Sequence, residues 1–454
     1  MEIIKNHKFL YIISSLAIGI YFQGLQLYFY LTGLINFKPQ WLTAFYMISL
    51  LIITFYGLFI LKDNRKKLFN LGFLEICYLL FYILVLIDYR YFITKNYDIP
   101  DFMIIYFTVY SFSLFISRAL FFRQIKIIFY STNILTFVTS ILLLHQLLSG
   151  SASFTADGVR LVAGSTNNPI NTGYLGAYCC TTSLIIFFTN KLKISGKIYS
   201  FLACITGFYI TILAGTRSAF IFCGISIFFI LLASIWSKIF FLHQNMKIIY
   251  QNNLINIFLI ILFGITLIFF TLSSSITDSL WGTNNLWIQN LSDQFSRLST
   301  ISSIFFGDEY TKLDDSASGR VILYKNAISI FIQNPIFGGG VYSAGYVHNA
   351  FLQSASELGM LGLLTFSIPF FYLGLLCIKN FWRINLSSEF YYKNSDYWSI
   401  NLFCVILFVQ ATCQWSFHGD PYRSYIPLCS IGLLMSYFKL PALKNTRTKL
   451  KNKL

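Results

Sequence analysis

Long apolar runs are the feature that most limits what this chain can fold into. Runs of roughly 20 apolar residues recur along the sequence, and a helix of that length crosses the hydrocarbon core of a bilayer. Only 11% of the residues are charged, whereas a soluble domain carries about 25%. The runs also lack the strict alternation of an outer-membrane barrel. They exclude a soluble or disordered chain and indicate a polytopic helical membrane protein.

The positions of the runs predict about 12 transmembrane helices and one large loop. The predicted spans are residues 10–30, 41–61, 68–88, 102–117, 127–148, 169–189, 198–215, 218–236, 254–272, 351–378, 398–416 and 424–440. The loop is residues 273–350, and a long loop in a compact protein is usually functional. Within it a helix is expected from about Arg320 to Gln333, where Asn334-Pro335 ends it. The predicted fold is an all-α integral membrane protein.

The basic residues predict how the chain sits in the membrane. The net charge of +16 does not indicate nucleic acid, because Lys and Arg occur as short clusters between apolar runs. With the N-terminus in the cytoplasm, every cytoplasmic loop is rich in Lys or Arg, as the positive-inside rule requires. Both termini are therefore predicted to be cytoplasmic. The nine cysteines lie inside apolar runs without metal-binding spacing, and we interpret them as small core residues.

Ionisable residues are scarce inside the predicted spans. Glu75 is the one that we place deep within a span, and we expect it to reach the cytoplasmic boundary or to pair with Lys66 or Lys67. Ion-coupled transporters usually carry such groups in the bundle interior. This scarcity argues against a proton-driven pump.

The outer face carries cations that the positive-inside rule does not explain. They are Arg160, Arg217, Arg297, Arg320 and Arg423, accompanied by His348-Asn349 at the end of the large loop. Guanidinium groups match phosphate oxygens bidentately, so several of them would suit a lipid diphosphate. A neutral histidine such as His348 could then activate an acceptor hydroxyl. A headgroup anchor or a salt-bridge partner is the simpler interpretation of any single arginine, and it stays open for Arg160, Arg297 and Arg423.

Three sequence elements resemble the O-antigen ligase and polymerase superfamily. The first runs from Ser318-Gly319-Arg320 through Phe331–Gly340 to His348-Asn349, and nine residues separate Asn349 from Gly359-Met360-Leu361-Gly362. The others are Gly215-Thr216-Arg217-Ser218-Ala219 and the segment Gly164–Gly176, which contains Asn168-Pro169. The resemblance covers roughly residues 155–375. Taken alone, Gly359 and Gly362 are interpreted more simply as helix-packing contacts.

This resemblance implies a fold, an activity and a set of site residues. Members are inner-membrane glycosyltransferases with a GT-C-like bundle that take a glycan from undecaprenyl diphosphate on the periplasmic face, without a cofactor or metal. Arg217 and Arg320 would bind the diphosphate, and His348 would be the acceptor base. Arg160, Asn349 and Arg423 are further candidates for substrate contacts. The acceptor is a lipid-linked repeat unit in polymerases and lipid A–core in ligases.

The resemblance leaves the reaction and the partners open. We favour the polymerase, because polymerases are many and divergent whereas a cell usually needs one ligase. A chain-length regulator is a possible protein partner, and nucleic acid is not expected. A transporter of lipid-linked sugars and a scaffold without chemistry are the competing classes. The expected parts are residues 1–150 with N-terminal spans, 151–378 as the ligase- or polymerase-like core, and 379–454 with the last spans and a basic tail.

Overall fold

The structure, a computed structural model, is built almost entirely of helices in the part of the chain that it describes. It describes residues 2–34, 40–93, 102–149, 151–154, 160–163, 169–189, 193–242, 315–385, 394–419, 421–422 and 424–439. The predicted span at 254–272, most of the large loop and the candidates Arg297 and Arg423 lie outside these residues.

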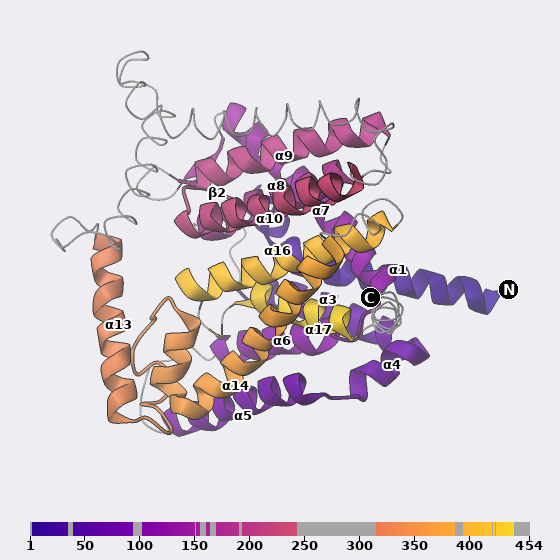
Figure 1. Cartoon of the computed structure of the whole chain (residues 1–454). Coiled ribbons are helices and arrows are strands. Elements are labelled where there is room, and N and C mark those ends of the chain that lie inside the picture. The colour runs from indigo at the N-terminus through magenta and orange to yellow at the C-terminus, as the bar shows by residue number, and fades with distance from the viewer. Residues whose placement is uncertain are drawn as a thin grey trace, which may run out of the picture.

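The described elements follow the order of the apolar runs (Figure 1). The helices are α1 (Glu2–Gln23), α2 (Leu25–Leu34), α3 (Gln40–Ile60), α4 (Lys62–Phe69), α5 (Phe73–Ile93), α6 (Phe102–Ser117), α7 (Phe122–Leu148), α8 (Pro169–Phe188), α9 (Ile194–Ala214), α10 (Arg217–Leu242), α13 (Asp315–Gln333), α14 (Ala350–Asn380), the π-helical turn η3 (Phe381–Asn385), α16 (Ser395–Phe417) and α17 (Tyr425–Phe438). Two short antiparallel strands, β1 (Ser153–Phe154) and β2 (Leu161–Val162), form a hairpin between α7 and α8. The all-α prediction holds apart from this hairpin.

Six described helices are long and apolar enough to cross a membrane, and eight candidates result if each bent pair counts as one span. The protein is therefore a multi-pass membrane protein, although the number of twelve is not confirmed. One bent pair is α1 and α2, which meet at 71° beside Gly24. A Cβ at Gly24 would lie 2.4 Å from the carbonyl oxygen of Ile20, so the close backbone contact at this bend requires glycine. Each described predicted span coincides with a helix.

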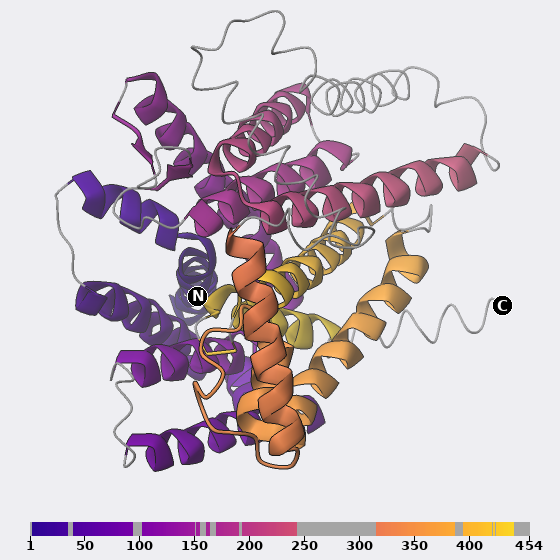
Figure 2. The same cartoon turned by 90° about the vertical axis from the view of Figure 1, so that its left-hand side faces the viewer.

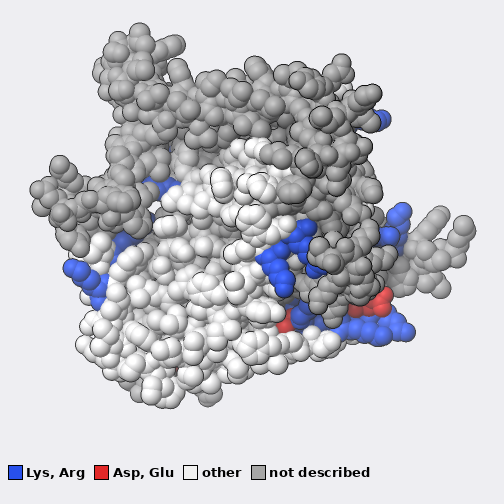
Figure 3. All heavy atoms as spheres, viewed as in Figure 1, with Lys and Arg blue, Asp and Glu red and all other residues white. Residues whose placement is uncertain are grey.

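The surface of the bundle has the pattern that lipid requires. On the face in Figure 3, the described Lys and Arg side chains lie toward the left and right edges, and the surface between them is almost wholly uncharged. Large apolar side chains are exposed on several helices, among them Phe45 at 68%, Ile87 at 63% and Leu375 at 66%. Apolar patches this extensive are rare on soluble monomers and mark contact with lipid or another apolar partner.

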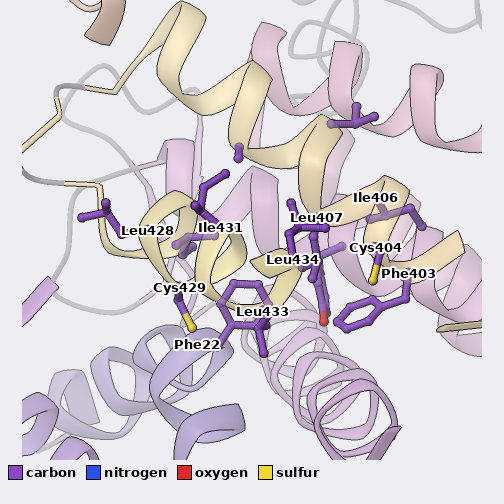
Figure 4. Packing of buried hydrophobic residues seen from close by; sticks show 14 of the residues in the cluster. Phe22, Phe403, Cys404, Ile406, Leu407, Leu428, Cys429, Ile431, Leu433 and Leu434 are labelled. Atoms are coloured by element: carbon purple, nitrogen blue, oxygen red, sulfur yellow. The ribbon is translucent and has the colours of Figure 1, made fainter. Parts of the chain in front are cut away.

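The core is centred on α16 and α17. Trp398, Trp415 and Tyr437 are fully buried there, and Figure 4 shows side chains of both helices packed with Phe22 of α1. Helices α8 and α9 approach most closely at Gly176 and Gly207, where an added Cβ would lie 2.6 Å from the carbonyl oxygen of the other glycine. All nine cysteines are buried and unoxidised, as the sequence predicted.

One end of the bundle is crossed by α13. This helix runs roughly at right angles to α5 and α16 at the left of Figure 1, and it lies in front of them in Figure 2. The helix expected at Arg320–Gln333 is thus present, and it begins five residues earlier, at Asp315. The opposite end, at the right of Figure 1, holds α4 and the start of α1.

Glu75 lies at this opposite end and corrects one prediction. Its carboxylate is fully buried and pairs with Arg118, at 3.5 Å, and with Lys439, not with Lys66 or Lys67. The chain turns between α4 and α5, and Lys67 instead donates a hydrogen bond to the carbonyl of Leu120 at 2.8 Å. We call Glu75, Arg118, Lys67 and Lys439 the Glu75 cluster.

Candidate functional site

Arg217 stands at the first residue of α10, after a turn too tight for a true loop. Gly215 ends α9 in the left-handed conformation (φ 60°), which glycine adopts at little cost. The hydroxyl of Thr216 then donates to the carbonyl of Pro169 at 3.1 Å. The starts of α8 and α10 are thereby held side by side. Both helix N-termini carry partial positive charge, which adds to that of Arg217 and favours an anion.

Arg160 precedes β2 and is placed by the hairpin. The backbone N–H of Ala163, just after β2, donates to the hydroxyl of Thr172 at 3.1 Å. Thr172 belongs to the first turn of α8, so the hairpin is tied to the same helix start as the Thr216 turn. The hairpin thus brings a third element toward the end of the bundle that carries Arg217.

His348 is held by the residue that follows it. The Asn349 side chain caps α14, because its Oδ1 accepts a hydrogen bond from the N–H of Leu352 at 3.0 Å. Its Nδ2 donates to the carbonyl of Ser416 at 3.2 Å, near the end of α16. Asn349 was predicted as a substrate contact, and that role stays a prediction; in the structure both ends of its amide position His348. His348 itself has a φ of +62°, a conformation that non-glycine residues adopt uncommonly and that concentrates at functional sites.

A break in α14 anchors the loop that leads to His348. Gly359 interrupts the helix with φ 64° and ψ −157°, so it is a backbone break and not a regular helix-packing position as the sequence had indicated. The N–H groups of Gly339 and Gly340 donate to the carbonyls of Ser356 and Glu357, at 2.8 and 2.9 Å. In return the N–H of Met360 donates to the carbonyl of Pro335 at 2.8 Å. The loop therefore satisfies the carbonyls that the break would leave without partners.

Two further contacts fix the same loop. The N–H of Val341 donates to the carboxylate of Asp88, near the end of α5, at 2.5 Å. On the other side Ala327 of α13 forms a small core with Ala344 and Val347. This core holds α13, and with it Arg320, against the loop that carries His348.

A second histidine, His418, lies beside the first. The ring centroids of Tyr346 and His348 are 4.1 Å apart, and the Tyr346 hydroxyl donates to the carbonyl of His418. His418 follows the last residue of α16, in the run of residues that ends at Arg423. His418 was not among the site residues predicted from the sequence, although a histidine in an outer loop near the candidate arginines was a usable signal.

The lowered pKa values of the two histidines indicate which predicted residues lie near them. Burial, assisted by the charge of Arg320, lowers the pKa of His348 to about 4. Burial lowers the pKa of His418 to about 3, and Arg320, His348, Arg160 and Arg217 all act in the same direction. Such effects need groups close in space, so Arg160, Arg217, Arg320, His348 and His418 form one group, which we call the His348 cluster. Both imidazoles are neutral at pH 7.

A buried carboxylate behind the cluster was also missed. Glu357 lies within the predicted span 351–378 and is fully buried. Its Oε1 accepts from the amide of Gln353 at 3.0 Å, and its Oε2 accepts from the hydroxyl of Tyr422. The expectation that Glu75 alone is deep within a span is therefore wrong. Among the described residues, no group of three or more His, Cys, Asp or Glu side chains is arranged to hold a metal ion.

Comparison with known proteins identifies a family match that contains part of the His348 cluster. Residues 202–367 match the family described as O-antigen ligase. None of the curated proteins compared with the chain is similar to it. The matched segment contains Arg217, Arg320 and His348, whereas Arg160 and His418 lie outside it. This segment is therefore similar to the O-antigen ligase family, in agreement with the resemblance seen in the sequence.

Proposed function

We propose that the protein is a membrane glycosyltransferase that moves a glycan from undecaprenyl diphosphate during O-antigen or related surface-polysaccharide synthesis. The observation that carries the proposal is the His348 cluster, in which Arg320 acts on the neutral His348 and three arginines act on the neutral His418. A diphosphate is the leaving group that such a set of cations would stabilise. The proposed site faces the periplasm from the inner membrane, with both termini in the cytoplasm.

The proposed reaction is a single displacement at the anomeric carbon of the donor. The acceptor hydroxyl oxygen forms a bond to that carbon while the bond to the phosphate oxygen breaks. The electron pair of the breaking bond goes to the phosphate oxygen, where Arg217 and Arg320 offset the growing charge. The hydroxyl proton passes to the imidazole of His348. Arg160 and Arg423 are proposed as additional contacts to the substrate.

The electrostatics of the cluster supports a base that strengthens when substrate binds. Burial, and to a smaller extent the charge of Arg320, disfavours protonation of His348 in the free enzyme. A bound diphosphate would offset the charge of Arg320, so the pKa of the imidazole should rise part of the way toward its ordinary value of about 6.5. The histidine would then accept a proton more readily when donor is present than when it is absent.

A polymerase is the form of the reaction that we propose, with the ligase as the alternative. Both use the same donor and differ in the acceptor, which is a lipid-linked repeat unit for a polymerase and lipid A–core for a ligase. A chain-length regulator would be a partner of the polymerase. The family match and the site residues fit a polymerase and a ligase equally well. The polymerase is preferred because polymerases are many and divergent, whereas a cell usually needs one ligase.

Deletion in the native host separates the alternatives. After deletion, lipopolysaccharide is extracted and run on a gel. A core with a single repeat unit and no ladder indicates the polymerase. A bare core, with long chains retained on undecaprenyl diphosphate, indicates the ligase. An unchanged ladder would mean that this protein does not act on O-antigen.

Complementation with single variants tests the site itself. Arg217→Ala and His348→Ala should each leave the protein in the membrane and abolish glycan transfer. Normal transfer in both variants would refute the site assignment. Movement of lipid-linked glycan across liposome membranes, with no glycosidic bond formed, would favour a transporter instead.

A further inference from the structure

His418 has a side chain that its structural role does not require. The residue ends α16, and its N–H donates to the carbonyl of Gln414 at 3.0 Å. Its carbonyl accepts the hydroxyl of Tyr346. Both contacts use backbone atoms, so any residue at this position could make them. The imidazole must be explained separately.

The backbone directly after His418 is tightly confined. An added Cβ at the next residue, Gly419, would lie 2.8 Å from the Ser424 hydroxyl and 2.9 Å from the carbonyl of Gln414. The turn therefore needs glycine, and it fixes the direction in which the chain leaves His418. A histidine placed by a turn this tight is better suited to a defined contact than to a general surface role.

One ring nitrogen of each histidine in the cluster lacks a partner within the described part of the chain. Nδ1 of His348 and Nδ1 of His418 are buried, and neither makes a hydrogen bond to any residue in the described part of the chain. A buried polar atom left without a hydrogen bond costs about 1–3 kcal/mol. Such atoms in a site are expected to find their partner in the ligand.

The neighbours of His418 define which ligand group it suits. Burial, together with the charges of Arg320, Arg160 and Arg217, disfavours protonation of the imidazole, so it stays neutral. Phosphate oxygens will bind to the guanidinium groups, which are charged and bidentate. A neutral imidazole offers one donor and one acceptor, which matches an uncharged hydroxyl.

We propose that His418 is a substrate-contacting residue that hydrogen-bonds a saccharide hydroxyl next to the diphosphate held by the arginines. This inference rests on the proposed glycosyl transfer and adds a second histidine to it. The hydroxyl belongs either to the first sugar of the donor or to the acceptor. A donor contact should affect mainly KM for the lipid-linked glycan, and an acceptor contact mainly KM for the acceptor.

The test uses three variants of the full-length protein in detergent with lipid, assayed for transfer from an undecaprenyl-diphosphate-linked glycan. His418→Ala keeps both backbone contacts and removes the ring. His418→Asn restores polar atoms near the position of Nδ1. His145→Ala is the matched control, because His145 is exposed and lies near the end of α7, outside the cluster.

We expect His418→Ala to lower kcat/KM about 10- to 100-fold, the loss typical of one buried hydrogen bond to substrate. The unfolding temperature should stay the same, and His418→Asn or added free imidazole should restore part of the activity. His145→Ala should behave as wild type.

Two results would overturn the assignment of His418. One is full activity in His418→Ala. The other is a loss that comes with a lower unfolding temperature and that neither Asn nor imidazole reverses, because it would mean a structural role. Arg217→Ala in the same assay keeps this test separate from the proposed function. If Arg217→Ala is also fully active, glycosyl transfer at this site is itself wrong.

Discussion

Charged residues lie at both ends of the bundle, but their neighbours differ. In the Glu75 cluster a buried carboxylate lies between Arg118 and Lys439, and Arg118 also donates to the carbonyls of Lys67, Leu68 and Asn70 at 2.6 to 3.1 Å. In the His348 cluster the charged groups that act on His418, within the described residues, are arginines. The fold supplies the counterion at one end. At the other end the cations act on a neutral imidazole, and the anion that we propose to bind there is the diphosphate of the substrate.

The two ends are joined by a single helix. Glu75 lies in the first turn of α5, and Asp88, thirteen residues later, accepts from Val341 in the loop before His348. At 1.5 Å per residue, this separation along the helix is about 20 Å. The contrast between the clusters is therefore a contrast between two ends of the helical bundle, one paired within the fold and the other the proposed site of chemistry.

Removal of Arg217 should give the largest effect and leave the fold intact. Arg217→Ala is expected to reduce transfer about 1,000-fold, comparable to the loss of a main group that stabilises a leaving anion. The unfolding temperature should change little, because Arg217 is half-buried at the start of α10 and is not part of the apolar core. Arg123→Ala, at an exposed arginine at the start of α7, is the control and should keep full activity. A large loss of stability in Arg217→Ala would place this arginine in a structural ion pair instead.

Removal of Glu75 should give the opposite result. Glu75→Ala leaves Arg118 buried without its counterion, and the expected cost is about 3 kcal/mol of unfolding free energy. Transfer per folded molecule should stay normal. Chemical unfolding in detergent and specific activity would be measured together, with Asp63→Ala of α4 as an exposed control. Reduced specific activity in a Glu75 variant of normal stability would contradict the assignment of a purely structural role to the Glu75 cluster.

The sequence predicts the two ends to different extents. Apolar runs place the helices well, because burial in lipid demands about 20 apolar residues whatever the partners are. Arg217, Arg320 and His348 were selected by charge on an unexpected face, and the structure brings them together. The partners of Glu75 were not predicted, since Arg118 and Lys439 come from distant parts of the chain. Pairing across a bundle depends on helix rotation and packing, which one sequence does not reveal.

The residues near the site that were not predicted from the sequence also escaped prediction for physical reasons. Glu357 and Gly359 fall inside an apolar run, and hydropathy averages over them. A glycine at φ 64° breaks α14 there, and the loop of Gly339 and Gly340 fills the gap. His418 was missed because its neighbours in space come from α10, α13, the hairpin and the loop before α14. Local motifs predict local structure, whereas a convergent site depends on tertiary contacts.

The break at Gly359 should prove necessary for the His348 cluster. A Cβ at this position would lie 2.3 Å from the carbonyl oxygen of Ile336, and φ of +64° is itself unfavourable for other residues. Gly359→Ala should therefore cost about 2 kcal/mol and reduce transfer along with stability. Gly224→Ala is the matched control, because nothing lies within 4 Å of its added Cβ. Equal behaviour of the two variants would show that the loop does not depend on the break.

The pH dependence of stability and of activity should differ between the His348 cluster without substrate and the cluster with bound substrate. His348 has a folded-state pKa of about 4 against about 6.5 when unfolded, so its neutral form stabilises the fold above pH 6.5. That contribution is lost as the pH falls from 6.5 toward 4. At about pH 5 the free enzyme should keep about 30 times more neutral imidazole than an ordinary histidine would.

The lowered pKa of His348 predicts the order in which kcat/KM and kcat fall as the pH is lowered. The acid limb of kcat/KM reports the free enzyme and should fall only near pH 4. The acid limb of kcat reports the complex, in which diphosphate offsets the arginines, and it should fall at a higher pH. Coincident limbs would show that bound substrate does not neutralise the cations around His348. A His348→Ala variant with residual activity should lose the difference between the two limbs.

The smallest expected effect comes from Tyr346, the residue between the two histidines. Tyr346→Phe keeps the ring beside His348 and removes the hydrogen bond to the carbonyl of His418. One such bond contributes about 1 kcal/mol, so the unfolding free energy should fall by about that amount and kcat/KM by about fivefold. Tyr324→Phe, in which a tyrosine of α13 outside this contact loses its hydroxyl, is the comparison. A loss in Tyr346→Phe as large as that in Arg217→Ala would mean that this hydroxyl takes part in the reaction itself. A small loss would instead confine the chemistry to the arginines and the imidazoles, and leave Tyr346 as the group that holds His348 and His418 in register.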